Sequence, residues 1–159
     1  FGELFSGLFM GMIIILLAFF IQTGNVNGFV VWISLPIVIT IGLINMANNI
    51  RDRVKDKASG RKTLPILLGK KASITFMAAM YILAYLIVIF TALFKSGGSL
   101  FYLLVLFSFP MPIKAIRRFN KNDTPASMMP AMAATGKTNT VFGILYALGI
   151  YISALLGGI

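Results

Sequence analysis

Long apolar runs separated by short polar segments make up most of this chain of 159 residues. The runs are continuous rather than alternating, which predicts membrane-spanning helices and disfavours the strands of a transmembrane barrel. Five such helices are predicted, at about residues 5–22, 29–58, 72–94, 100–113 and 138–156. We therefore predict an all-α integral membrane fold in which residues 1–159 form a single transmembrane region.

The second predicted helix carries polar residues on one face and continues beyond its apolar part. At 100° per residue, five polar side chains fall within an arc of about 100°, the width of one helix face. These residues are Asn45, Asn48, Asn49, Asp52 and Asp56. Polar groups at the end of an apolar helix are costly and usually serve a function or bind another helix. This polar face is therefore the candidate functional site.

The two aspartates of the polar face suggest a metal site. Asp52 and Asp56 lie four residues apart, so their carboxylates are neighbours and repel each other unless a cation lies between them. Mg²⁺ prefers oxygen ligands and is typically held by one or two carboxylates together with phosphate oxygens of a substrate. Nearby basic side chains would bind those phosphates, and the candidates are Arg51, Lys57, Arg61 and Lys62.

Composition places the chain in a membrane and excludes several kinds of chemistry. Hydrophobic residues make up 58% of the chain and charged residues 11%, with a mean hydropathy of +0.93. The absence of cysteine and histidine excludes thiol chemistry, zinc sites, haem ligation through histidine and Ser-His-Asp catalysis. A net charge of +10 would suggest nucleic acid in a soluble protein. Here membrane topology explains most of the excess, and we expect no nucleic-acid partner.

The cations also predict the orientation of the helices. Eight of the 14 basic residues lie between positions 51 and 71, in the polar end of the second helix and shortly after it, and five follow the fourth helix, whereas one follows the third and none follows the first. Such alternation predicts a multi-pass protein of the cell membrane with the aspartate-containing loop in the cytoplasm. The alternative is a plain basic loop, in which two aspartates balance charge and the cations bind anionic lipid in a transporter or scaffold.

Three further features bear on packing and boundaries. Glu3 stands just before the first helix, where it is either solvated or part of a site. Gly7 and Gly11 form a small-xxx-small pair, which favours close helix packing. Thr124 and Pro125 form a plausible helix start, and the moderately apolar stretch that follows is expected to lie in the interface or to re-enter the membrane.

The sequence at residues 48–69, NNIRDRVKDKASGRKTLPILLG, resembles the second aspartate-rich motif of the UbiA-type intramembrane prenyltransferases. That motif contains Asp-x-x-x-Asp, a glycine four residues on, a basic residue, threonine and an apolar stretch ending in glycine. The doubled asparagine, the GRKTL run, FGELFSG and PAMAATGKTNTVFG are most similar to the menaquinone branch, the 1,4-dihydroxy-2-naphthoate polyprenyltransferases. The resemblance extends over the whole chain.

The resemblance implies a bundle of nine transmembrane helices around a cavity that opens to the membrane. Two aspartate-rich motifs, one in each half, hold Mg²⁺ ions that bind a polyprenyl diphosphate. This chain, which starts at Phe1, would supply roughly the last five helices and the second motif, as part of a longer protein. Glu3 and Asp123, the other two acidic residues, stand alone and cannot replace the first motif. Without the N-terminal half, the chain is expected to be inactive.

The resemblance also implies a mechanism and membrane partners. Mg²⁺ on Asp52 and Asp56, with Asn48 placed to orient one of them, would neutralise the diphosphate as it leaves an allylic carbon. Candidate diphosphate contacts are Arg51, Lys57, Arg61, Lys62 and Asn48. The allylic cation would attack an aromatic acceptor, 1,4-dihydroxy-2-naphthoate, which loses CO₂, while the apolar walls shield the prenyl tail within the lipid bilayer. The ubiquinone, haem O and chlorophyll branches remain alternatives.

Overall fold

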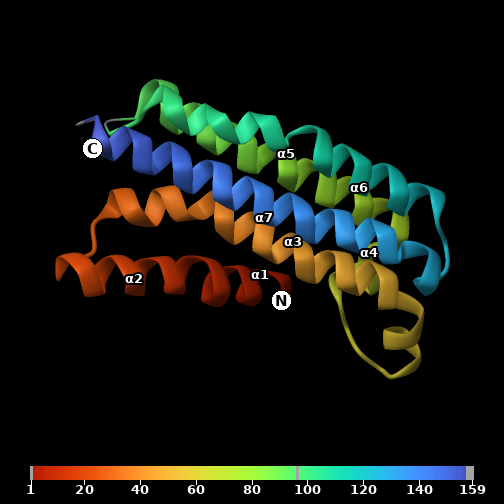
Figure 1. Cartoon of the computed structure of the whole chain (residues 1–159). Coiled ribbons are helices and arrows are strands. Elements are labelled where there is room, and N and C mark those ends of the chain that lie inside the picture. Colours follow the sequence, from red (N-terminus) through yellow and green to blue (C-terminus); the bar gives the residue numbers. More distant parts are fainter. Residues whose placement is uncertain (1, 96, 157–159) are drawn as a thin grey trace.

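A computed structural model describes residues 2–95 and 97–156 as helices and their connections (Figure 1). Three elements form the first helical stretch: α1 (Gly2–Gly7), the π-helical turn η1 (Leu8–Ile13) and α2 (Ile14–Thr23). The remaining elements are α3 (Gly28–Ala58), α4 (Leu64–Leu68), α5 (Lys70–Phe94), η2 (Leu100–Ser108), α6 (Pro110–Lys121) and α7 (Pro125–Leu155).

Five helical stretches in the described part of the chain are long and apolar enough to cross a membrane. They are α1–α2 taken together, α3, α5, η2 with α6, and α7. The prediction of an all-α membrane fold with five spanning helices is therefore confirmed. Within this set, α3 is 31 residues long, which exceeds the roughly 20 residues needed to span. Its polar C-terminal part can therefore extend beyond the apolar layer.

Two helix boundaries differ from the sequence-based expectation. The last helix begins at Pro125 rather than at residue 138, because Thr124 and Ser127 form a capping box and Pro125 occupies the first turn. The fourth helix, expected at residues 100–113, continues as α6 to Lys121. Pro110 and Pro112 lie in the first turn of α6, where proline is tolerated because its missing N–H would be unpaired anyway.

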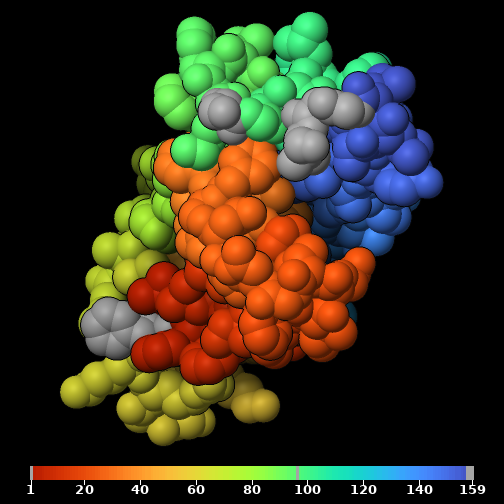
Figure 2. Space-filling model, turned by 90° about the vertical axis from the view of Figure 1, so that its left-hand side faces the viewer, coloured from red at the N-terminus to blue at the C-terminus, as the bar shows by residue number. Residues whose placement is uncertain are grey.

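Helices α3, α5, η2–α6 and α7 pack together around two apolar clusters. One cluster lies near the aspartates and includes Met46, Met77 and Phe119, and the other includes Tyr102 and Phe142. The first helical stretch packs along α3 alone among the described elements. Figure 2 looks nearly along the helices and shows that stretch, red to orange, at the edge of the bundle. Most of its surface is therefore left to other partners or to lipid.

Glycines allow the first helical stretch to approach α3 closely. Gly7 and Gly11 both face Val38, and a Cβ at Gly11 would lie 3.0 Å from the Val38 Cα. On the α3 side, a Cβ at Gly42 would lie 2.8 Å from the carbonyl oxygen of Glu3. Small residues at such crossings let two helix backbones approach. The consequence for function is that Glu3 lies against the polar face of α3.

Candidate functional site

Asp56 is a buried carboxylate with one oxygen free. Arg61, in the connection after α3, donates from Nη1 to the Asp56 Oδ1 over 3.0 Å. The Asp56 Oδ2 is buried and has no hydrogen-bond partner in the described part of the chain. A buried carboxylate oxygen without a partner is costly, and such atoms in proteins usually bind something further. This oxygen is therefore an available ligand atom.

Asp52 lies one turn earlier on α3 and is paired with its neighbour Arg51. The guanidinium binds the carboxylate in a bidentate manner, with Nε donating to Oδ1 over 2.8 Å and Nη2 donating to Oδ2. The Arg51 Nη1 also contacts the Met132 sulfur of α7 at 2.9 Å and that of Met129 at 3.5 Å. Each aspartate of the motif is therefore paired with its own arginine, Arg51 with Asp52 and Arg61 with Asp56.

A contact between distant parts of the sequence orients Asn49. Its Nδ2 donates to the Glu3 Oε1 over 2.7 Å, across 46 positions of sequence. An ionised carboxylate can only accept hydrogen bonds, so the amide must present its nitrogen to Glu3. The Asn49 oxygen is then left for another donor or for a cation. Glu3, left open by the sequence analysis, thus belongs to the site.

These residues surround a polar pocket of about 250 Å³ at the crossing of α1 and α3. It is lined by Gly2, Glu3, Asn45, Asn49, Arg61, Lys62 and Thr63. Arg61 links this pocket to Asp56 through its hydrogen bond. The pocket therefore combines two cations, two amides and the Glu3 carboxylate, and Arg61 connects it to the buried Asp56. The two cations can bind a charged phosphate group there.

An apolar groove of about 740 Å³ adjoins the polar pocket. Its walls are mainly aliphatic and aromatic side chains from the first helical stretch, α3, α4 and α5, among them Val38, Leu43 and Phe76. Glu3 and Lys62 line both the groove and the pocket, so the two spaces meet at these side chains. Together they suit an amphipathic ligand with an anionic head and a long apolar tail.

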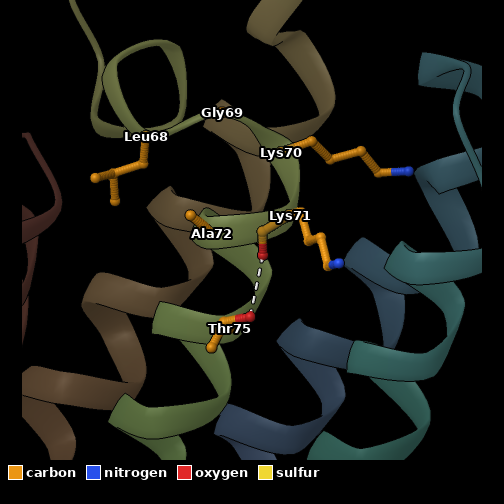
Figure 3. Close-up of a pocket in the computed structure, with 6 residues that line it drawn as sticks. All are labelled: Leu68, Gly69, Lys70, Lys71, Ala72 and Thr75. Carbon is orange, nitrogen blue, oxygen red and sulfur yellow. Dashed lines mark hydrogen bonds between the residues drawn. The ribbon is translucent and has the colours of Figure 1, made fainter.

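The other predicted site residues have different surroundings. Asn48 is partly exposed and Lys57 is exposed, and neither lines the polar pocket or the apolar groove. Figure 3 shows a wide opening at the start of α5, where Lys70 and Lys71 extend to the side of α6 and α7. Lys70 is engaged there, since its Nζ donates over 2.6 Å to Asp123 in the connection between those helices.

The donor set fits a cation shared between protein and substrate. The described residues contain no group of three or more His, Cys, Asp or Glu side chains that would enclose a metal by itself. Mg²⁺ seldom needs such a cage, because it keeps waters and takes phosphate oxygens beside one or two carboxylates. The unpartnered Oδ2 of Asp56 is a ligand atom of that kind. The residues present therefore fit the expected metal.

The comparisons identify the class of protein. The profile of the UbiA prenyltransferase family matches residues 1–139. The chain therefore belongs to the UbiA prenyltransferase family, which confirms the resemblance seen in the sequence. No solved structure matches it.

Two curated relatives of this family are similar to the chain over most of its length. Over 96% of its length the chain is 46% identical to the 1,4-dihydroxy-2-naphthoate octaprenyltransferase of Bacillus subtilis, covering 49% of that protein. It is 32% identical to the UbiA prenyltransferase domain-containing protein 1 homolog of Drosophila melanogaster over 91% of the chain and 39% of the homolog. The chain thus spans about half the length, or less, of these curated relatives.

Proposed function

We propose that this chain forms the C-terminal half of a nine-helix prenyltransferase of menaquinone biosynthesis. The reaction is transfer of a polyprenyl group from a prenyl diphosphate to 1,4-dihydroxy-2-naphthoate. The observation that carries the proposal is the junction of the polar pocket with the apolar groove at Glu3 and Lys62, beside the buried Asp56. The name of the Bacillus subtilis relative supports this choice of acceptor.

The diphosphate binds at the polar pocket in this proposal. Lys62 lines both spaces, so its ammonium group would contact the phosphates where the head of the ligand meets its tail. Arg61 lines the pocket while its guanidinium is held by Asp56. Cations held in this way stabilise the negative charge that develops on the diphosphate as the allylic bond breaks. Arg51, Lys57 and Asn48 are the remaining candidate contacts around the aspartates.

Asp52 and Asp56 would hold Mg²⁺, which supplies charge neutralisation to the leaving diphosphate. The protein contributes the two carboxylates, with the Asp56 Oδ2 available and the Asp52 carboxylate held in place by Arg51. The Asn49 oxygen, oriented by Glu3, is a further acceptor on the same helix face. The apolar groove houses the prenyl tail and keeps water away from the allylic cation.

The remaining helices and the orientation in the membrane are also part of the proposal. The other half of the bundle would supply the first aspartate-rich motif, and the complete bundle means this chain together with that half. The loop after α3 would face the cytoplasm, because eight of the 14 basic residues lie between positions 51 and 71, in the polar end of α3 and shortly after it. In the absence of the other half, the chain would not catalyse prenyl transfer.

A panel of acceptors tests the reaction. The complete bundle is incubated with a long-chain prenyl diphosphate, Mg²⁺ and, in separate reactions, the aromatic acceptors of the menaquinone, ubiquinone, haem O and chlorophyll branches. We expect product with 1,4-dihydroxy-2-naphthoate and none with the isolated chain. Preference for another acceptor would contradict the branch, and the absence of any product from the complete bundle would contradict the reaction.

Loss of the Glu3 carboxylate is expected to weaken ligand binding through Asn49. Glu3→Leu removes the acceptor of the Asn49 hydrogen bond, whereas Glu3→Gln keeps an oxygen that accepts it. Removal of a residue that orients a ligand-binding group typically lowers the affinity about 10- to 100-fold. We expect a loss of that size in the dissociation constant of prenyl diphosphate for Glu3→Leu and a much smaller loss for Glu3→Gln. Equal affinities of both variants and the unmodified protein would contradict this role of Glu3.

A further inference from the structure

A second polar opening lies between α6 and α7, and it shares no residue with the polar pocket or the apolar groove. This cationic groove has a volume of about 290 Å³. It is lined by Met111, Lys114, Arg118, Ala133, Ala134 and Lys137. Three cations from two helices therefore meet at one opening that the proposed prenyl transfer does not use.

The charges of the cationic groove are not balanced by the protein around it. The sequences of α6 and α7 contain no acidic residue, and Asp123 between them is bonded to Lys70. Arg118 donates from Nη1 to the Pro130 carbonyl over 3.0 Å, which holds its guanidinium at the groove. Lys114 and Lys137 make no hydrogen bond or ion pair within residues 2–95 and 97–156. An anion from outside would relieve the repulsion among these cations.

Lys137 makes the strongest case for such an anion. It is the only charged residue of α7, which has 31 residues. At a rise of 1.5 Å per residue it lies about 18 Å along the helix from Pro125. The apolar part of this helix that is long enough to span begins after Lys137, at the predicted residues 138–156, so Lys137 lies at the polar boundary of the apolar layer, at the depth of lipid head groups. No residue of opposite charge occurs on α6 or α7 themselves.

We propose that the cationic groove binds the phosphate of an anionic membrane phospholipid. Basic pockets between spanning helices are suited to phospholipid head groups. Ala133 and Ala134 leave room for the phosphate between the helices. Ile144 lies seven residues after Lys137 on the same face of α7, further into its apolar part, and Leu148 lies one turn beyond it. Both side chains are exposed. Their side chains provide an apolar surface for acyl chains beneath the head group.

Native mass spectrometry of the complete bundle tests this site. The protein is titrated with dioleoyl phosphatidylglycerol, with the zwitterionic dioleoyl phosphatidylcholine, and with inorganic phosphate. A groove triple variant carries Lys114→Gln, Arg118→Gln and Lys137→Gln. A control triple variant removes the same charge outside the groove, through Lys71→Gln, Arg117→Gln and Lys121→Gln. Lys137→Arg keeps the charge and reports on folding.

We expect the unmodified protein, the control triple variant and Lys137→Arg to prefer phosphatidylglycerol. The groove triple variant should bind phosphatidylglycerol at least about tenfold more weakly, because each cation near an anionic lipid head group adds to the affinity and three are removed. Equal losses in both triple variants would show general surface charge and overturn the site. Equal binding of phosphatidylcholine would overturn the charge recognition, and displacement of the lipid by inorganic phosphate would assign the site to a soluble phosphate compound instead.

Discussion

Replacement of Asp56 by asparagine is expected to lower the rate of prenyl transfer by the complete bundle at least about 100-fold. The change is isosteric, and the asparagine oxygen can still accept the hydrogen bond from Arg61. It removes the negative charge that the proposed site needs to hold Mg²⁺ beside the diphosphate. The initial rate at saturating substrate and Mg²⁺ measures the effect, and the unfolding temperature confirms that the variant is folded.

Asp123→Asn is the matched control for this prediction. Asp123 is 85% exposed, lies outside the polar pocket and pairs with Lys70. A surface ion pair of this kind contributes about 0–1 kcal/mol to stability, so the control should transfer prenyl groups at nearly the unmodified rate. A rate for Asp56→Asn that matches the rate for Asp123→Asn would contradict the assignment of Asp56.

Substitution of Gly42 by alanine is expected to separate the first helical stretch from α3. The new Cβ would lie 2.8 Å from the Glu3 carbonyl oxygen, which belongs to the backbone and cannot rotate away. Overpacking of this kind costs about 1–3 kcal/mol. For a domain of this size each kcal/mol lowers the unfolding temperature by about 2–4 °C. The affinity for prenyl diphosphate should fall as well, because Gly42 and Glu3 both line the apolar groove.

Gly143→Ala separates this effect from the general consequence of placing alanine in a helix. A Cβ at Gly143, on α7, would meet nothing within 4 Å. Alanine favours the helix over glycine by about 1 kcal/mol, so this variant should be neutral or stabilising. The unfolding temperature in detergent should therefore fall for Gly42→Ala and stay the same or rise for Gly143→Ala. A fall of the same size in both would contradict the close approach at Gly42.

Local patterns in the sequence predicted the number of spanning helices, because each helix satisfies its own backbone hydrogen bonds within a continuous apolar run. These patterns were less informative at residues 125–137, because a moderately polar composition does not distinguish the start of α7 from a loop. The capping signal at Thr124 was visible, yet helix formation through Pro130 depends on packing against α3 and α6. Pro110 likewise begins α6 because η2 ends just before it, at Ser108, whereas the helix predicted at residues 100–113 extended past this point.

The site could be predicted only as far as one helix determines it. Helical periodicity placed the asparagines and aspartates on a single face of α3. The hydrogen bond between Asn49 and Glu3 depends on the crossing of two helices at Gly42, which no local pattern contains. Of the cations, Arg61 and Lys62 line the polar pocket, whereas Lys57 does not. Which cation reaches the pocket depends on the path of the chain after α3.

Binding of a long-chain prenyl diphosphate to the complete bundle, with and without Mg²⁺, tests the central claim most directly. The titration is done on the unmodified protein, Asp52→Asn, Asp56→Asn and the control Asp123→Asn. We predict binding that requires Mg²⁺ in the unmodified protein and the control, and its loss in the two variants of the motif. Binding that is independent of Mg²⁺, or that persists in Asp52→Asn and Asp56→Asn, would contradict a metal-assisted diphosphate site on α3.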